Sequence, residues 1–366
     1  MRSVNIGICG LGTVGAGVYN VLSRNSKQIN SRANCDIVIS QVGARRDNPN
    51  CDTAATDVSR DIFAVARNPD VDIVVELIGG TDVALELVML ALENGKHVVT
   101  ANKALIAMHG MEIFAVAESR GLIVAYEAAV AGGIPIIKAL REGLAANRIN
   151  WLAGIINGTT NFILSEMDSK GREFADVLTE AQEKGYAEAD PTFDVEGIDA
   201  AHKLVIMASL AFAMPLNLDG IFTDGITKLE PQDVGYAREL GYAIKHLGIT
   251  RQTENGVELR VHPTLVPESC LIAGVNDVSN AVMVNADAVG TTLYYGPGAG
   301  SEPTASSVIA DIVDVARTMG SVADTWVPSL GCNSASLQQQ KIMAIEDIDT
   351  SFYIRFAALD QPGVLS

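Results

Sequence analysis

The chain has 366 residues, of which 48% are apolar and 19% charged, and 44 acidic residues against 26 basic ones give it a formal net charge of −18. That length exceeds what one hydrophobic core usually holds, so we expect two or three domains. The acidic surplus argues against nucleic acid or an anionic membrane as a partner, because both bind basic surfaces.

The cysteines are odd in number and stand singly, at positions Cys9, Cys35, Cys51, Cys270 and Cys332. This pattern argues against a disulfide framework or a zinc site and fits a reducing cytoplasm. We expect no signal peptide, because an apolar strand begins within four residues of the start. We also expect no membrane span, because no uninterrupted apolar stretch of about 18–20 residues occurs.

The start of the chain predicts a dinucleotide-binding turn. The apolar run Val4–Cys9 predicts a strand, and the apolar periodicity of Val14–Leu22 predicts a helix. Between them lies a GxGxxG motif, made of Gly10, Leu11, Gly12, Thr13, Val14 and Gly15. In such motifs the first glycine permits a tight turn, the second lets a pyrophosphate approach, and the third allows close packing of helix on strand. The amides at the start of the helix then bind the phosphates.

Strands and helices alternate through the rest of the first third. We expect strands at Asp36–Val42, Val71–Ile78, Lys96–Thr100 and Leu122–Tyr126, and helices at Ile62–Arg67, Val83–Asn94 and Met111–Arg120. This order predicts an α/β fold with a Rossmann-type doubly wound parallel sheet. Ligands of such sheets bind beyond the carboxyl ends of the strands, where Gly79, Thr100 and Lys103 are expected to line the cofactor crevice.

The end of the second predicted strand bears on the choice of nucleotide. It is followed by Gly43, Ala44, Arg45 and Arg46 with no immediate acid, and Asp47 comes next. A carboxylate at this point suits the ribose hydroxyl of NAD, whereas an arginine suits the 2′-phosphate of NADP. We therefore expect NADP(H) to be preferred, with Arg45 at the phosphate and NAD(H) still possible. Two solvent-exposed arginines without a role are the alternative.

The pattern changes after Gly133 and predicts a second domain. An apolar helix is expected at Ile134–Leu144, followed by a strand at Asn150–Ile156, an Asn-Gly turn and a helix at Phe162–Met167. Thr159 and Thr160 in that turn are expected to cap the helix, although they could also bind a ligand. Further strands at Glu258–Val266, Asn280–Ala286 and Thr291–Tyr295 predict a mixed sheet with helices on one side.

Residues 185–203 carry five acids and a single lysine around a proline-broken turn. The pattern becomes helical from Val195, so Asp199 and Lys203, four residues apart, share one face of the helix. Such a cluster can hold a small polar zwitterion and place an ammonium beside its reacting oxygen. The alternative is a surface turn with an ion pair that stabilises the helix by only about 0.3–0.5 kcal/mol.

Six segments in order resemble homoserine dehydrogenases and cover roughly residues 4–325. The specific one is the run from Ala181 to Lys203, AxxxGYAxxDPxxDVxGxDxxxK. The others are GLGTVG, TANKAL, EAAVAGGIP, NGTTNFIL and GPGAGSEPTAS, at residues 10–15, 100–105, 127–135, 157–164 and 296–306.

The resemblance implies reduction of L-aspartate 4-semialdehyde to L-homoserine with NADPH or NADH, a step shared by threonine and methionine biosynthesis. Lys203 would then donate the proton to the carbonyl oxygen, and Asp199 would orient that lysine or a bridging water. It also implies a set of substrate-binding residues, namely Glu188, Asp194, Tyr186, Gly158, Thr159 and Lys103. Lys103 and Gly300 would lie near the cofactor as well.

Some homoserine dehydrogenases bind a structural monovalent cation such as Na⁺. The resemblance assigns its ligands to side chains or carbonyls of Glu127, Val130, Gly132 and Ile134. The loop could also hold together without an ion. No metal with a redox or Lewis-acid function is expected, because an ammonium can stabilise and protonate the developing alkoxide.

The resemblance also implies the domain organisation. The nucleotide-binding domain is expected at residues 1–131 and 304–325, and an inserted α+β substrate-binding and dimerisation domain at 132–303. A helix is expected at Val308–Met319, and the resemblance implies that it packs on the nucleotide-binding domain. Residues 326–350 are loop-rich and predict a linker. A predicted strand at Phe352–Ala357 and the DQPGVL motif at 360–365 look like the start of an ACT domain that ends at Ser366. Threonine would then be a partner only if that domain were complete.

A homodimer or homotetramer and a small-molecule substrate are therefore expected. Two alternatives remain. The first is a semialdehyde dehydrogenase that acylates a cysteine, which would need an activated thiolate beside the nicotinamide. None of the five cysteines is expected at a strand end beside the crevice. The second is a non-catalytic NADP-binding sensor, which the pair formed by Asp199 and Lys203 argues against.

Overall fold

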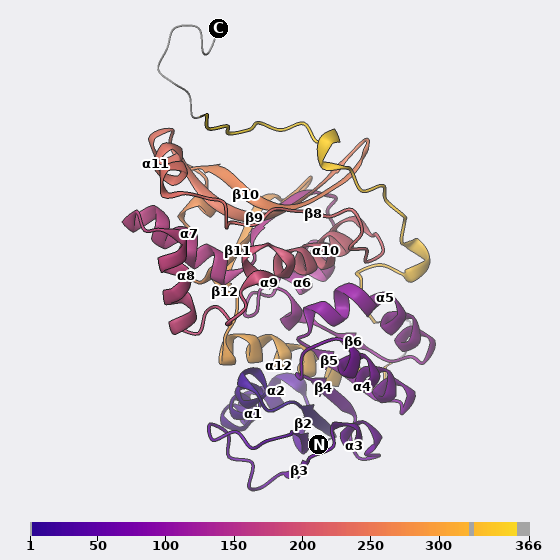
Figure 1. The fold of residues 1–366 in the computed structure, drawn as a ribbon. Coiled ribbons are helices and arrows are strands. Elements are labelled where there is room, and N and C mark those ends of the chain that lie inside the picture. Colours follow the sequence, from indigo (N-terminus) through magenta and orange to yellow (C-terminus); the bar gives the residue numbers. More distant parts are fainter. Residues whose placement is uncertain (1, 322–325, 357–366) are drawn as a thin grey trace, which may run out of the picture.

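The computed structural model describes residues 2–321 and 326–356, and these build two six-stranded sheets joined by helices (Figure 1). The first sheet has the order β3-β2-β1-β4-β5-β6 and is parallel throughout. Its strands are β1 (Ser3–Cys9), β2 (Asp36–Gly43), β3 (Asp57–Ser59), β4 (Ile73–Glu76), β5 (His97–Thr100) and β6 (Val124–Ala125). The Rossmann-type sheet expected from the sequence is confirmed.

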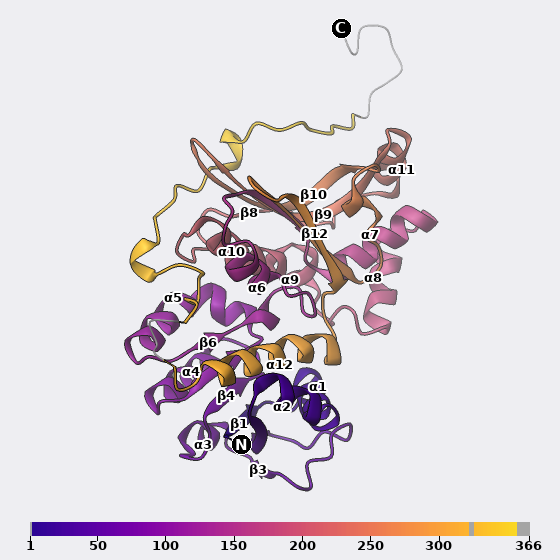
Figure 2. The same ribbon diagram turned by 180° about the vertical axis from the view of Figure 1, so that it is seen from behind.

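Helices cover both faces of this sheet, so its strands are apolar on both sides. Ile73 and Val75 pack toward one face and Val74 toward the other, because successive side chains of a strand alternate. The helices from the first third are α1 (Thr13–Arg24), α2 (Ser26–Ala33), α3 (Ile62–Arg67), α4 (Asp82–Glu93) and α5 (Lys103–Ser119). A late helix, α12 (Ser301–Thr318), packs against α1 and α2 (Figure 2).

The chain runs outward from β1 to β2 and β3, and then returns to the other side of β1 to begin β4. This reversal makes the carboxyl ends of β1 and β4 the switch point of the sheet, the usual ligand position in doubly wound sheets. The glycine turn that follows β1 lies at this switch point, beside the segment that follows β4.

The second sheet has the order β12-β11-β7-β9-β10-β8. All its neighbours are antiparallel except β8 and β10, which makes it the mixed sheet that was expected. Its strands are β7 (Ile149–Ile155), β8 (Phe222–Thr223), β9 (Tyr242–Thr253), β10 (Gly256–Pro267), β11 (Ser279–Ala286) and β12 (Gly290–Pro297).

Most of the helices that accompany the second sheet lie between the two sheets (Figure 1). They are α6 (Ile136–Lys138), α7 (Gly158–Lys170), α8 (Phe174–Glu183), α9 (Thr192–Val195) and α10 (Ile198–Phe212), while α11 (Pro231–Glu239) packs near one end of β9. Helix α10 contacts β9 and β10 on one side and α5 on the other. It therefore joins the second sheet to the nucleotide-binding sheet.

Several predicted boundaries were wrong. Helix α5 begins at Lys103 rather than Met111, because the Asn102 side chain caps it by accepting the Leu105 N–H. Helix α12 begins at Ser301 rather than Val308, since a proline in the first turn, Pro303, does not interrupt a helix. Helix α7 begins at Gly158 rather than Phe162.

Several elements had no counterpart in the sequence prediction, among them α2, β3, α8, β8, α11 and β9. The strand predicted at Phe352–Ala357 was wrong for residues 352–356, which have no regular structure and no partner strand among residues 2–321 and 326–356. Ala357 and the motif at 360–365 lie outside the described residues. No helix in the described part of the chain is long and apolar enough to cross a membrane.

Two buried histidines make stability depend on pH. The Nδ1 atom of His97 accepts the Ile123 N–H at 3.0 Å, and burial lowers the pKa of His97 to about 4. Burial also lowers the pKa of His246 to about 4. An unfolded histidine titrates near about 6.5, so the neutral rings stabilise the fold fully above that pH, and this contribution is lost as the pH falls toward 4.

We expect the free energy of unfolding to decrease between pH 6.5 and pH 4 by about 3 kcal/mol per buried histidine. Urea titrations of wild type and His97→Gln over this range will measure it, because the variant removes one titrating ring. His109→Gln is the control, since His109 is half-exposed and pairs with Glu112 on α5. Identical pH dependence in wild type and His97→Gln would contradict the assignment.

Candidate active site

The glycine turn has the shape that a dinucleotide requires. Gly10 has a φ of +103°, and a Cβ there would lie 2.5 Å from the Leu77 carbonyl oxygen. A Cβ on Gly15 would lie 2.0 Å from the Gly10 carbonyl oxygen, whereas Gly12 faces open space. No side chain caps the start of α1, so its first amides are free to bind phosphate. The motif residues therefore fit a dinucleotide.

A buried glutamate that the sequence analysis missed fixes the neighbouring strand ends. Glu76 accepts the Ile78 N–H at 2.9 Å and the Thr100 hydroxyl at 2.6 Å. Thr100 in turn accepts the Asn102 N–H at 3.0 Å. Burial raises the pKa of Glu76, although these hydrogen bonds oppose the shift. The sequence did contain a signal for this role, because Glu76 is the only charged residue of an otherwise apolar strand, β4, and stands at its end.

The arginines after β2 lie at the surface. Arg45 and Arg46 are exposed, whereas the Asp47 carboxylate accepts a hydrogen bond from the Arg60 guanidinium at 2.8 Å. The same guanidinium donates to the Ala44 carbonyl at 3.1 Å. Arg60 follows β3, which the sequence analysis did not predict, so its presence beside Asp47 was missed.

Gly300 and Gly79 both have positive φ angles, of +131° and +71°. Gly300 is the N-cap of α12. The next residue, Ser301, donates its hydroxyl to the Thr13 carbonyl at 2.7 Å. The segment before α12 therefore lies against the glycine turn.

Two lysines hold one buried carboxylate, that of Asp199. Lys203 Nζ lies 2.7 Å from Asp199 Oδ2 and donates to the Ile156 carbonyl at 2.7 Å. Lys103 Nζ lies 3.0 Å from Asp199 Oδ1. Lys103 is the first residue of α5, which packs on the first sheet, and Asp199 lies in the first turn of α10, which packs on the second sheet. The ion pair between them therefore joins the two sheets and their helices. The ion pair expected between Asp199 and Lys203 is present and buried.

The charges in this cluster shift each other's pKa values. Burial would raise the pKa of Asp199, but the two lysines and the hydrogen bonds from Lys203 and Asn157 hold it well below its usual range. Burial lowers the pKa of Lys203, and the charge on Lys103 lowers it further, against the attraction of Asp199. Burial would also lower the pKa of Lys103, but nearby carboxylates outweigh it and raise the value.

Asn157 bridges two carboxylates of the cluster. Its Nδ2 donates to Asp194 Oδ1 at 2.7 Å and to Asp199 Oδ2 at 2.8 Å. Its Oδ1 accepts the Thr160 N–H at 2.9 Å, so Asn157 also caps α7. The expectation that Thr159 and Thr160 cap this helix was wrong. The sequence indicated that Asn157 belongs to an Asn-Gly turn. It did not indicate the bonds to Asp194 and Asp199, because these residues are distant in sequence.

The other residues implied to bind substrate surround the cluster unevenly. Thr159 is buried and donates its hydroxyl to the Tyr186 carbonyl at 2.6 Å, and Gly158 leaves no room for a Cβ beside the Val278 carbonyl. The Tyr186 side chain is half-exposed and meets Phe162 edge-on. Glu188 is exposed, and its negative charge raises the pKa of Lys103.

The turn implied to hold a cation is held by hydrogen bonds. The Glu127 carboxylate accepts the Ile137 and Lys138 N–H groups at 2.9 and 2.8 Å, which caps α6. The carbonyls of Glu127, Gly132 and Ile134 accept bonds from Val130 N, Ser307 Oγ and Ile136 N. Burial raises the pKa of Glu127 to about 6. Three of the four carbonyls implied to hold the cation thus accept hydrogen bonds within the protein, which suits the alternative of a turn that holds together without an ion.

One expectation about the cysteines was wrong. Cys9 is the last residue of β1, at a strand end beside the crevice. Its side chain is buried, however, and its thiol donates to the Ile62 carbonyl at 3.7 Å. Burial strongly raises the pKa of Cys9, so it is not the thiolate that an acylating dehydrogenase needs.

A glycine turn at the switch point of a doubly wound sheet, with two lysines around a buried carboxylate, defines a nicotinamide-nucleotide-dependent oxidoreductase. Two family models match, homoserine dehydrogenase over residues 135–313 and the homoserine dehydrogenase NAD-binding domain over residues 10–127. The chain belongs to the homoserine dehydrogenase family, as the resemblance implied.

Relatives support this assignment over the whole chain. A homoserine dehydrogenase of Pseudomonas aeruginosa is 65% identical over 366 residues, which are 100% of this chain and 84% of the relative. The crystal structure of one from Thiobacillus denitrificans is 56% identical, with a TM-score of 0.91 over 95% of this chain and 81% of that chain. A hyperthermophilic archaeal homoserine dehydrogenase in complex with NADPH, 24% identical with a TM-score of 0.73 over 86% and 98%, shares the fold.

Two substitutions separate the structural and electrostatic roles of Asn157. Asn157→Ala removes the cap and both donated bonds, so we expect about 1 kcal/mol less stability and about 10–100-fold lower kcat/KM. Asn157→Asp keeps a capping carboxylate but places it between two others. We therefore expect a similar or larger loss of activity and an intact cap.

Steady-state kinetics and urea unfolding of both variants will measure these effects. Asn147→Ala is a control, because Asn147 donates to a local carbonyl far from the cluster. Wild-type turnover in Asn157→Asp would show that the bridge does not matter for activity.

Proposed function

We propose that this chain interconverts L-aspartate 4-semialdehyde and L-homoserine by hydride transfer with a nicotinamide nucleotide, in the shared step of threonine and methionine biosynthesis. Lys203 is the proton donor in this proposal. The observation that carries it is the buried pair formed by Lys203 and Asp199. Within the homoserine dehydrogenase family, such a pair suits reduction of an aldehyde.

The ammonium of Lys203 has three N–H donors, and two of them are used by Asp199 and the Ile156 carbonyl. The third remains for the carbonyl oxygen of the substrate. The nicotinamide supplies the hydride when it is bound. As negative charge develops on the substrate oxygen, the ammonium stabilises it and then transfers its proton.

The surroundings of Lys203 suit this role. Its side chain is only 12% exposed, so little water competes for the third N–H. The lowered pKa eases release of the proton, while Asp199 stays ionised and holds the amine in place. Asp199 is thus the positioning residue of the pair.

The remaining residues supply a binding site for a small zwitterion. We propose that Glu188 and Asp194 bind its ammonium, that Lys103 contacts its carboxylate or the nicotinamide, and that Gly158, Thr159 and Tyr186 shape the wall. Lys103 Nζ lies 5.8 Å from the centre of the Phe193 ring. Phe193 belongs to α9, the short helix before α10. Phe193 is therefore a further neighbour of the substrate side of the cluster.

We expect Lys203→Ala to lower kcat by about 10²–10⁴-fold, because that is the usual contribution of a general acid. The control is Lys228→Ala, since Lys228 forms a similar ion pair with a residue four positions away, Asp224, but is 82% exposed. The assay is oxidation of NADPH with the semialdehyde. Unchanged turnover in Lys203→Ala would refute the proposed role, and absence of turnover in the wild type would favour the sensor alternative.

We propose that NADP(H) is preferred and NAD(H) is also used. The carboxylate that would favour NAD, that of Asp47, is engaged by Arg60, whereas Arg45 is exposed beside the crevice. The exposed guanidinium of Arg45 can bind the 2′-phosphate of NADP. The carboxylate of Asp47 repels that phosphate less because it is paired with Arg60.

We expect Arg45→Ala to raise the KM for NADP by about 10-fold or more and to leave the KM for NAD nearly unchanged, because only NADP carries the 2′-phosphate. Steady-state kinetics with both nucleotides will measure this. Arg67→Ala is the control, since Arg67 is exposed on α3 and pairs with Asp61. Equal changes for the two nucleotides would contradict the phosphate contact.

A homodimer and a structural monovalent cation complete the proposal. The second sheet offers its outer face for pairing, since most of its helices lie on the side of the first sheet (Figure 1). A cation would be held by the carbonyls of Glu127, Val130, Gly132 and Ile134, because the Glu127 carboxylate already binds two amides.

A further inference from the structure

A cavity of about 430 Å³ lies between α5, α12 and residues 326–337, and it shares no residue with the lysine cluster or the glycine turn. Most of its wall is apolar and includes Phe114, Leu122, Val315 and Leu330. This volume and lining are typical of sites for small molecules.

The outer wall of the cavity is fixed to the core. The Tyr126 hydroxyl donates to the Ser329 carbonyl at 2.5 Å, and the Ser334 hydroxyl donates to Glu118 at 3.1 Å. The Trp326 ring meets the His97 ring edge-on at 5.9 Å. Residues 326–337 therefore close one side of the cavity.

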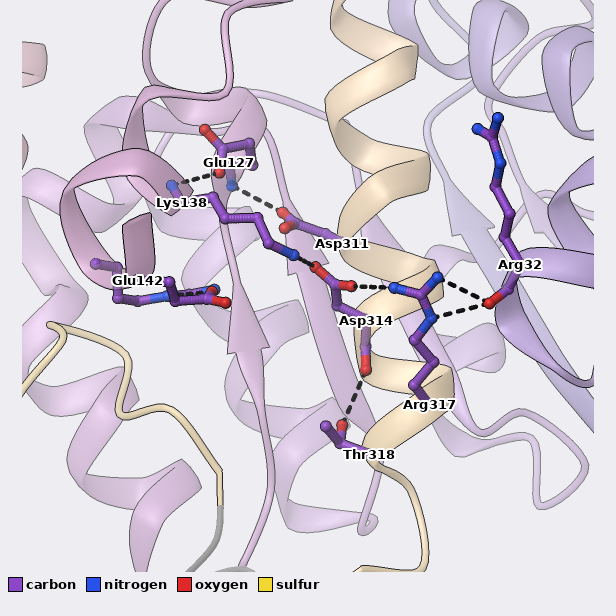
Figure 3. A network of polar contacts seen from close by, with 9 residues as sticks. Arg32, Glu127, Lys138, Glu142, Asp311, Asp314, Arg317 and Thr318 are labelled. Carbon is purple, nitrogen blue, oxygen red and sulfur yellow. Dashed lines mark hydrogen bonds and ion pairs between the residues drawn. The ribbon is translucent and has the colours of Figure 1, made fainter. Parts of the chain in front are cut away.

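A buried carboxyl group lines the cavity, and only one of its two oxygens is hydrogen-bonded to the residues that the structure describes. Asp311 is 4% exposed, and its Oδ2 accepts the Glu127 N–H at 2.7 Å. Its Oδ1 has no donor among residues 2–321 and 326–356. Figure 3 shows the contrast with Asp314, whose carboxylate is engaged by Lys138 and Arg317.

A guanidinium lines the same cavity. Arg141 uses Nε and Nη2 to donate to one oxygen of Glu142, at 3.3 and 2.9 Å. Its Nη1 has no acceptor in the described part of the chain. Arg141 and Asp311 form no ion pair with each other among these residues, although both line the cavity. Beside the apolar wall there are thus a donor and an acceptor that no residue in the described part of the chain engages.

We propose that this cavity binds a small zwitterion with an apolar side chain, an α-amino acid, whose carboxylate meets Arg141 and whose ammonium meets Asp311. The apolar side chain packs against Phe114, Leu122 and Val315. Burial raises the pKa of Asp311 to about 8, so the carboxyl group must release its proton when the ammonium binds. The charge-assisted bonds that then form are strong because they are shielded from water. The site is separate from the proposed catalytic residues and does not depend on the reaction they perform.

Thermal unfolding of the full chain with L-leucine, L-methionine and L-phenylalanine tests the proposal. We expect at least one of them, at about ten times its Kd, to raise Tm by about 2 °C or more. For that amino acid, the matching amine and the matching carboxylic acid, which each lack one charged group, are expected to bind at least about tenfold more weakly.

Variants locate the binding. Ala115→Trp fills the mouth of the cavity from an exposed position on α5, so it abolishes the shift without disturbing the core. Met108→Trp is its control, because Met108 is exposed on the same helix and does not line the cavity. Asp311→Asn keeps the acceptor for the Glu127 N–H and weakens binding by at least about tenfold.

Three results would overturn the proposal. One is the absence of a shift with all three amino acids. Another is a shift that survives Ala115→Trp, which would assign the binding to a different place such as the active site. The third is equal binding of the amine or the acid alone, which would remove one of the two polar contacts.

Discussion

The site depends on one buried carboxylate, that of Asp199, being ionised between two ammonium groups. A lone carboxylate with 3% exposure would be costly, because burial disfavours its charge. The lysines and Asn157 offset that cost and hold the carboxylate in one position. The three partners come from α5, α10 and the start of α7, so the charge balance also holds these helices together.

The nucleotide-binding sheet brings its own part of the site to the same place. Its switch point puts the glycine turn beside the end of β4, and the bonds of Glu76 hold the ends of β4 and β5 in register. Lys103 follows β5 by three residues, so it reaches from this edge to Asp199. The proposed reaction requires the nucleotide and the proton donor to meet. The contact of Lys103 with Asp199 joins the nucleotide-binding edge to the carboxylate that also holds Lys203.

Local sequence predicted much of this, and contacts across the fold account for what it missed. The GxGxxG turn and the spacing of Asp199 and Lys203 are fixed by a few neighbouring residues, so both were correct. The pair of Lys103 with Asp199 and the bond between Glu76 and Thr100 join residues far apart in the chain, which no local pattern records. Helix starts were predicted late at Lys103 and Ser301, because asparagine, glycine and proline before a helix resemble loop residues. Apolar and polar residues do not alternate regularly in β9, where the buried Lys245 and His246 are adjacent. The strand was therefore not predicted.

Helix α12 packs on the first sheet, although it follows the last strand of the second sheet in the chain. It covers the face that α1 and α2 share, and its apolar side chains fill the same core as Ile6 and Ile8. During synthesis the ribosome must therefore complete the entire second sheet before this face is sealed. Until then the nascent nucleotide-binding half exposes an apolar surface, so the two halves mature together rather than one after the other.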